Sequence, residues 1–427
     1  MKEDFLHYLW KFKKFNFLSA KTCGGETIEL QAVGMHNTSS SGPDFFNARL
    51  KIGEQVWAGN VEIHINSSDW YAHKHETDPA FDNVILHVVW EHDVEIFRKD
   101  NSAIPCLELK KLTPDYAWKN YKNLLAVNKK WINCATDFNS FSEFKLENWL
   151  ERLYVERLEK KSILIQDLLN RSKNDWEAVL FQLLAKNFGL NKNGEVFLKM
   201  AQSLPFSKIR QSDSSHQLEA LFFGQLNMLD KNSEIYFEKE LIQEYKFLKS
   251  KYNLKPILLK PQFFRLRPTN FPTIRLSQLA QLYASSKNLF SEVIKEWERD
   301  RFYAIFSTEA TEFWKSHYTF EKESKAKPKI LTKKFVDLIL INTVIPLKFA
   351  FDRNQGKADV DKLFGLMREL PGEKNRITNG FEELRKGVAD NAMASQALIQ
   401  LKPNYCDKNR CLECNLGLEL LNKKSVT

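Results

Sequence analysis

The sequence predicts an α/β domain with a mixed sheet at its amino-terminal end, followed by a larger, mainly α-helical domain. Residues 26–110 consist of short β-type runs separated by turn signals, whereas apolar residues recur at helical spacing from about residue 112 onward. Charge divides at the same place: residues 1–110 hold 11 Lys and Arg against 16 Asp and Glu, and residues 111–427 hold 52 against 38. We therefore expect two domains, at residues 1–111 and 112–427.

The amino-terminal domain is expected to begin with an amphipathic helix within residues 2–15. Strands are predicted in the runs ETIELQAVG, FFNARLKI, VWAGNVEIHI, NVILHVVWEHD and VEIFRK. Gly53 and Glu54 form the turn of a hairpin between the second and third of these runs. NVILHVVW is nearly all apolar, which is typical of a central strand that is covered on both faces.

The longest apolar run, VDLILINTVIPLKFAF at 336–351, is interrupted by Asn342, Pro346 and Lys348, so we expect a core helix rather than a membrane span. The first residues, MKEDFLHYLWKFKKFNF, have charges among their apolar positions and no small-residue cleavage site. Six cysteines in 427 residues do not resemble a secreted disulfide framework. These features predict a cytoplasmic protein without membrane association.

Two acidic residues and one histidine form the first candidate site. Side chains alternate along a strand, so Glu62 and His64 of VEIHI share one face. The Gly-Pro-Asp turn places Asp44 at the start of the preceding strand, and the hairpin then brings Asp44 close to Glu62. Paired carboxylates repel unless a cation lies between them. We expect a divalent cation there, on the exposed side of the sheet, with His64 beside it as a group that accepts a proton from water.

The pattern of Pro43-Asp44, a spacer and Glu62-x-His64 resembles the signature of the PD-(D/E)XK nucleases, with His64 where that family has Lys. The resemblance implies a restriction-endonuclease-like fold for the amino-terminal domain. It also implies that Mg²⁺ or Mn²⁺ is bound by Asp44, Glu62 and the backbone carbonyl of Ile63, with Glu3 as a further acidic residue from the first helix. The implied activity is hydrolysis of phosphodiester bonds.

Further polar residues cluster in NSSDWYAHKHETDPAFDN, which supplies Asp69, His73 and His75 as secondary candidates. If His73 and His75 were on a strand, both imidazoles would lie on one side, as zinc hydrolases arrange them. Alternatively, the segment is a polar loop in which Asp69 caps a helix. His36 is a second candidate for the same cleft as Asp44, and His87, within a strand, is expected to be a hydrogen-bonded core residue.

The carboxyl-terminal segment contains Cys406-x4-Cys411-x2-Cys414, a spacing that is typical of thiolate ligands. A fourth ligand is expected from Cys134, or alternatively Cys23, while Cys106 in IPCLEL is interpreted as core packing. Four thiolates suit either Zn²⁺ or a [4Fe-4S] cluster. Some PD-(D/E)XK-like nucleases join the carboxyl end to the catalytic domain in this way, with one early cysteine and three late ones.

The net charge of +9 predicts nucleic acid as a partner. Arg265, Arg267 and Arg275 alternate with phenylalanines in FFRLRPTNFPTIRLSQLA, as in surfaces that bind phosphates and stack on bases, although arginines also brace helix ends. Lys408 and Arg410 would add positive charge beside the cysteines.

Most of the chain is similar to the domain-of-unknown-function family 2851, through strings such as GPDFFNARL, WAGNVEIHINSSDWYAHKH and YCDKNRCLECNLG. That family implies no activity. The sequence is best interpreted as a metal-dependent nuclease-like protein acting on DNA or RNA. The alternatives are a non-catalytic nucleic-acid or protein-binding scaffold on a degenerate nuclease fold, and a zinc hydrolase that uses His64, His73 and His75.

Overall fold

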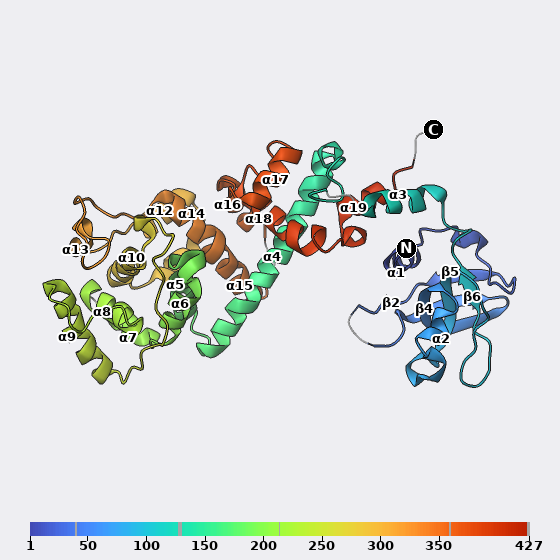
Figure 1. Cartoon of the computed structure of the whole chain (residues 1–427), viewed down its shortest axis with the longest axis horizontal. Helices are drawn as coiled ribbons and strands as arrows, with labels where there is room; N and C mark the ends of the chain where they lie inside the picture. The colour runs from blue at the N-terminus through green and yellow to red at the C-terminus, as the bar shows by residue number, and fades with distance from the viewer. Residues whose placement is uncertain (39–40, 127–129, 213, 358–359, 425–427) are drawn as a thin grey trace. The chain divides into compact units, whose positions relative to one another are not determined.

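The computed structural model describes residues 1–38, 41–126, 130–212, 214–357 and 360–424. The chain forms two compact units (Figure 1): unit 1 is Met1–Trp149 together with Leu401–Thr427, and unit 2 is Leu150–Gln400. This division differs from the predicted one, because residues 112–149 and the carboxyl-terminal segment belong with the sheet. Apolar side chains explain the difference, since Tyr121, Leu124 and Leu421 are buried in the same core as the first helix.

Unit 1 is built on a six-stranded mixed sheet in the order β1-β3-β4-β5-β6, with β2 paired to β3. The strands are β1 (Ile28–Ala32), β2 (Met35–His36), β3 (Phe45–Ile52), β4 (Gln55–Asn66), β5 (Val84–Glu91) and β6 (Cys106–Glu108). β3 and β4 form the predicted antiparallel hairpin, and its turn uses Gly53 at a φ of +58°, which favours glycine. β5 is parallel to both β4 and β6 and is buried along most of its length, as predicted for a central strand.

The run VEIFRK at 94–99 does not form the predicted strand; Phe97 makes only an isolated bridge to Ala103. The reason is topological. A parallel neighbour for β5 requires a crossover connection, and residues 92–105 provide it before β6 begins at Cys106.

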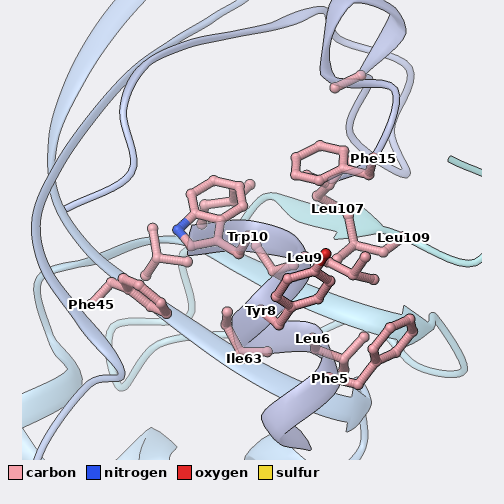
Figure 2. Close-up of a cluster of buried hydrophobic side chains, with 14 of the residues drawn as sticks. Phe5, Leu6, Tyr8, Leu9, Trp10, Phe15, Phe45, Ile63, Leu107 and Leu109 are labelled. Carbon is pink, nitrogen blue, oxygen red and sulfur yellow. The ribbon is translucent and has the colours of Figure 1, made fainter. Parts of the chain in front are cut away.

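One face of the sheet is covered by α1 (Glu3–Lys11), the helix expected within residues 2–15. Figure 2 shows its apolar side chains against the sheet. Val61 and Ile63 of β4 belong to this core, together with Phe5, Leu6, Leu9, Trp10, Phe45, Leu50 and Leu107. Because side chains alternate along a strand, Glu62 and His64 point to the opposite face. A smaller apolar cluster lies apart from this core and consists of Trp70, Phe81, Val84, Ile96 and Ile104.

The remaining elements of unit 1 are short helices and turns. Between β4 and β5 lie α2 (Asp69–Ala72) and the 3₁₀ turns η2 (His75–Thr77) and η3 (Pro79–Phe81), while η1 (Phe17–Ser19) precedes β1. After β6 come α3 (Asp115–Leu125) and η4 (Phe138–Ser140), and the carboxyl-terminal segment adds η7 (Lys402–Cys406), η8 (Cys411–Glu413) and α19 (Asn415–Leu421). α19 packs against α3, as Figure 1 also shows. This contact ties the end of the chain to its sheet unit.

Unit 2 is helical, as predicted. The division between the units falls within α4 (Glu143–Arg171), and the helices that follow are α5 (Trp176–Phe188), α6 (Leu190–Gln202), α7 (Phe206–Gln211), α8 (Ser215–Gln225), α9 (Tyr236–Lys251), α10 (Pro272–Ser285), α11 (Leu289–Lys295), α12 (Arg299–Ile305), α13 (Glu312–Ser316), α14 (Lys333–Ile339), α15 (Ile345–Asn354), α16 (Asp361–Glu369), α17 (Arg376–Leu384) and α18 (Ala392–Leu401), with the turn η5 (Pro268–Asn270) before α10.

The apolar run at 336–351 is helical and largely buried, as expected of a core helix. It passes from α14 through a π-helical turn, η6 (Leu340–Val344), into α15. Pro346 is the second residue of α15, just after this turn, and a proline has no N–H to continue an α-helical ladder, so the wider turn absorbs the break. In the part of the chain that the structure describes, no helix combines the length and apolar character needed to cross a membrane.

Candidate metal centre

Strand β4 presents Glu62 and His64 side by side, as the alternation of the sequence predicts. The expectation that this face is exposed is wrong, because Glu62 is only 6% and His64 only 2% exposed. The segment between β4 and β5 covers them. Trp70 from α2 lies near the ring of His75, with 5.4 Å between ring centroids, and Phe81 from η3 stacks on the same ring at 3.7 Å.

Three histidines converge on this face. His64, His73 and His75 each offer one ring nitrogen, and these atoms lie within 4.8 Å of one another. His73 Nδ1 is 3.1 Å from His64 Nε2. The residue between the two later histidines, Lys74, has a φ of +61°. This left-handed turn, not a strand, directs both rings toward β4, although non-glycine residues seldom adopt it.

Glu62 connects the histidines to the acidic edge of the site. Its Oε1 lies 3.5 Å from His64 Nε2 and 3.4 Å from His75 Nε2. Its Oε2 accepts a hydrogen bond of 3.0 Å from the backbone N–H of Asp44. Burial raises the pKa of the Glu62 carboxyl, against the lowering effect of His75. One carboxylate oxygen is thus held by the backbone while the other faces two imidazoles.

His64 is held from behind by His87 of β5, whose Nε2 lies 2.8 Å from His64 Nδ1. This contact directs His64 Nε2 toward the other histidines and Glu62, in the way that outer groups orient metal ligands. Burial, together with the neighbouring His75 and His73, lowers the pKa of His64 to about 3, so the ring is neutral at physiological pH. His87 is fully buried, as predicted, and hydrogen-bonded through one nitrogen.

Asp44 lies next to Glu62, as the hairpin predicted. Its Oδ2 accepts a 3.0 Å hydrogen bond from the backbone N–H of Ile63, and His7 Nε2 is 3.2 Å from the same oxygen. The backbone N–H of Ile63 therefore holds Asp44 in place, and the role of the Ile63 carbonyl as a metal ligand stays a prediction. Burial lowers the pKa of His7, but the hydrogen bond and charge of Asp44, with Glu3, outweigh burial and raise it overall.

Glu3 of α1 lies close enough to this group to interact with it electrostatically. Burial and the charge of Asp44 both raise the pKa of its carboxyl, and His73 is among the neighbours that lower it. The sequence did not identify His7, although Glu3 and His7 are four residues apart on α1 and therefore share a helix face. His36 is close by: its ring stacks on Phe45 with 4.7 Å between centroids and lies 5.3 Å from that of His7.

Asp69 begins α2 and accepts a 2.9 Å hydrogen bond from the backbone N–H of Asn66. It therefore shapes the turn after β4, and its charge also contributes to the raised pKa of Glu3. The hydrogen bond of Asp69 therefore favours the alternative interpretation, in which this residue stabilises local structure and does not bind a metal.

The three late cysteines lie near Cys134, which was the preferred candidate for the fourth metal ligand. The pKa of Cys406 is raised by burial and by the charges of Cys134, Cys414 and Cys411. Burial also raises the pKa of Cys134 to about 12. Their sulfur atoms are not among the groups of three potential ligands within 4.8 Å that the described residues form. Cys23, the alternative, lies instead beside Cys106.

The candidate nucleic-acid residues differ in exposure. Arg265, Arg267 and Lys408 are exposed. Arg275 is only 6% exposed, its guanidinium lies 3.7 Å from the centroid of the Phe335 ring, and it donates hydrogen bonds to Gln278 and Asn270. The interpretation of Arg275 as a phosphate contact is therefore wrong, and it has the bracing role of the alternative. Arg410 pairs with Glu413.

Fold and site together define a two-unit protein whose α/β unit contains a histidine-rich candidate metal centre bordered by carboxylates. The chain belongs to the family described as protein of unknown function (DUF2851), whose model matches residues 3–376. This confirms the resemblance to domain-of-unknown-function family 2851. No curated protein and no solved structure matched the chain.

Proposed function

We propose that this protein is a metal-dependent hydrolase whose ion is bound in unit 1 by His64, His73 and His75. The observation that carries the proposal is the convergence of one ring nitrogen from each histidine within 4.8 Å. Neutral imidazoles are ligands that suit Zn²⁺ and similar transition metals. A polar loop with solvated histidines would have no reason to turn His73 and His75 toward a buried strand.

The spacing of the atoms supports a tetrahedral ion. Ligand atoms about 2.1 Å from a tetrahedral zinc ion are roughly 3.4 Å from one another. His64 Nε2 is 3.1 Å from His73 Nδ1, and Glu62 Oε1 is 3.5 Å and 3.4 Å from the Nε2 atoms of His64 and His75. These three separations match those around one ion, and the three ring nitrogens all lie within 4.8 Å of one another.

A bound ion of this kind would supply a Lewis acid and a water that ionises near neutral pH. The protein would supply the rest of the chemistry. Glu62 has one oxygen fixed by the N–H of Asp44, so its other oxygen is positioned to accept a proton from water or to serve as the fourth ligand. His73 is exposed while His64 is buried, so substrate would enter past His73.

For the substrate we propose a phosphodiester bond of DNA or RNA. Residues 111–427 hold 52 basic against 38 acidic side chains, and Arg265, Arg267 and Lys408 are exposed. Positive charge attracts a polyanion, whereas an acidic site alone would repel it.

A second candidate is a Mg²⁺ or Mn²⁺ ion at Asp44 and Glu62, as the PD-(D/E)XK resemblance implies. The reciprocal hydrogen bonds favour it, since Asp44 N–H binds Glu62 and Ile63 N–H binds Asp44, which keeps the carboxylates adjacent. Glu3 adds a third carboxyl. Oxygen ligands suit Mg²⁺, whereas imidazoles do not, so the preferred metal distinguishes the two sites.

We further propose that Cys134, Cys406, Cys411 and Cys414 bind a structural Zn²⁺ ion or a [4Fe-4S] cluster. The spacing of the late cysteines supports this, as does the burial of Cys414 and the half-burial of the other three, because a bound cation would compensate the charge of thiolates that lie away from water. Visible absorption of anaerobically purified protein distinguishes the cluster from zinc.

The experiment uses chelated, full-length protein with labelled single-stranded DNA, double-stranded DNA and RNA, supplied with Zn²⁺, Mn²⁺ or Mg²⁺. We expect cleavage with Zn²⁺ or Mn²⁺, a loss of roughly 100-fold in His73→Ala, and no loss in His216→Ala, a half-buried histidine of unit 2. Cleavage that needs Mg²⁺, tolerates His73→Ala and is lost in Asp44→Ala would identify the second candidate. Metal binding without cleavage of any substrate would identify a scaffold and contradict the proposed activity.

A further inference from the structure

A second group of metal-ligand side chains lies in unit 1, on the other side of β5 in the sheet order. Cys23, His92 and Cys106 each provide one atom, and these atoms all lie within 4.8 Å of one another. Cys23 comes from the loop before β1, His92 follows β5 directly, and Cys106 begins β6. None of them belongs to the histidine site or to the late cysteines.

The group is held by backbone contacts. β6 is the last strand of the sheet, and the backbone N–H of Cys23 donates a 2.8 Å hydrogen bond to the carbonyl of Cys106. The two sulfur atoms lie within 4.8 Å of each other. The backbone of His92 is fixed as well, because its N–H donates a 3.3 Å hydrogen bond to Glu108 Oε2. The three side chains therefore meet without any rearrangement of the main chain.

The loop that carries Cys23 is a tight, self-bonded turn. Thr22 Oγ1 accepts from the N–H of Glu26 at 3.1 Å, and the N–H of Gly25 donates to the carbonyl of Thr22 at 2.9 Å. Gly25 has a φ of +91°, a conformation that side chains other than glycine disfavour. A preorganised turn of this kind positions a ligand, which a flexible loop would not do.

Two features of the group favour a ligand over ordinary packing. His92 Nδ1 is buried and has no hydrogen-bond partner among the described residues, which is a cost that a bound cation would remove. Cys106 is 5% exposed and was expected simply to fill the core, yet its sulfur faces a thiol and an imidazole rather than apolar side chains alone. Two sulfurs and one nitrogen form a donor set that Zn²⁺ prefers.

We infer that Cys23, His92 and Cys106 form a binding site for Zn²⁺ or another thiolate-preferring cation, with a fourth position open to solvent beside the exposed Cys23. When the ion binds, both thiols release their protons. A site with three protein ligands and an open position can exchange its ion or accept an exogenous ligand, unlike a closed structural site.

Cysteine alkylation tests the site directly in reduced, chelated, full-length protein. We expect added Zn²⁺ to slow iodoacetamide labelling of Cys23 at least roughly tenfold, because a metal-bound thiolate is not a free nucleophile. Peptide mapping assigns the effect to Cys23 and separates it from the other cysteines. The protection should disappear in His92→Ala and persist in His216→Ala.

A second variant keeps the test decisive if His92→Ala does not fold. Cys23→Ser changes an exposed side chain, and native mass spectrometry should show that it binds about one Zn²⁺ fewer than the wild type. Equal labelling of Cys23 with and without zinc, or an unchanged zinc count in Cys23→Ser, would overturn the site. A Cys23–Cys106 disulfide that forms in air whether or not zinc is present would assign the pair to redox chemistry instead.

Discussion

Glu62 contacts both the histidines and the acidic residues of the candidate metal centre. One of its oxygens is bound by the backbone at Asp44, and the other faces His64 and His75. It is the shared member of both candidate metal sites. A change that removes its charge but keeps its shape therefore separates a catalytic role from a role in folding.

We expect Glu62→Gln to fold normally and to lose about 100-fold or more in the rate of hydrolysis, because an amide cannot accept the proton of the attacking water. The glutamine oxygen can still accept from the N–H of Asp44. Single-turnover cleavage measures the loss, and Glu29→Gln, an exposed change in β1, is the control. Full activity in Glu62→Gln would exclude this residue as the base.

Glu219, in α8 of unit 2, gives a prediction about pH that is independent of any metal. Burial raises the pKa of its carboxyl to about 7, despite hydrogen bonds from Ser277, Thr311 and Trp314. The folded state thus binds this proton more tightly than the unfolded state. Its contribution to stability is fully present below the unfolded pKa of 4.5 and is lost as pH rises through 7.

The shift corresponds to about 3 kcal/mol in the free energy of unfolding between pH 4.5 and 7.5. We expect this part of the pH dependence to be absent in Glu219→Gln, whose amide oxygen can still accept from Thr311 and Trp314. Urea unfolding of both proteins at a series of pH values measures the difference. Parallel curves for variant and wild type would show that Glu219 is not protonated in the folded state.

The sequence predicted the placement of some of these site residues but not of others. The period of a strand placed Glu62 with His64, and the hairpin placed Asp44 beside them. The convergence of His73 and His75 depends on the left-handed φ of Lys74, which no pattern in the sequence specifies. Cys23, His92 and Cys106 are far apart in the chain and meet only through the pairing of β5 with β6 and the loop at its edge.

Helix α1 contributes to the core with one face and to the site with another. Phe5, Leu9 and Trp10 pack against the sheet, while Glu3 and His7 face Asp44. Its docking therefore fixes the distance between these polar groups and β4. The amphipathic pattern predicted the helix and its buried face, but a sequence does not show which strand the polar face meets.

We expect Trp10→Ala to lower the free energy of unfolding by about 3–5 kcal/mol, because the fully buried indole leaves a cavity and its hydrogen bond to Val33 is lost. Phe12→Ala, at the end of the same helix, removes a ring that is 44% exposed and should cost much less. Denaturant unfolding of both variants tests this. Equal losses would mean that the core does not lie where α1 meets the sheet.

Helix α19 has a close contact that only glycine permits. A Cβ on Gly417 would lie 2.1 Å from the carbonyl oxygen of Cys411, so the helix start is pressed against the turn that carries two of the cysteines. In α16, a Cβ on Gly365 would meet nothing within 4 Å. Close packing therefore requires glycine at position 417, whereas the space around position 365 would admit a side chain.

Gly417→Ala should destabilise the protein and weaken metal retention by the late cysteines, because the backbone must shift to admit the methyl group. Gly365→Ala should instead stabilise the protein by about 0.5–1 kcal/mol, through the ordinary preference of helices for alanine. Thermal unfolding and metal analysis of the two variants test the pair. An unperturbed Gly417→Ala protein would contradict the close packing of α19.

Across the whole chain, composition correctly separated a sheet-containing part from a helical part. It misplaced the division, because amphipathic helices such as α3 and α19 look the same whether they pack on a sheet or on other helices. Their partners are decided by long-range apolar contacts, here in the core that contains Tyr121 and Leu421. The same limit explains Arg275, whose sequence neighbours indicate a basic surface although its side chain is buried on Phe335.

The cysteines proposed to share one metal come from both segments of unit 1. Cys134 lies before the helical unit and Cys406, Cys411 and Cys414 lie after it, so all of unit 2 is inserted between them. A metal bound by the four would close a very long loop, which restricts the unfolded chain and stabilises the fold.

Anomalous diffraction at the zinc edge, from crystals of the full chain supplied with zinc, tests the histidine centre most directly. We expect a peak about 2.1 Å from ring nitrogens of His64, His73 and His75, with Glu62 beside it. A peak coordinated only by Asp44 and Glu62, or none near the three histidines, would contradict the proposal.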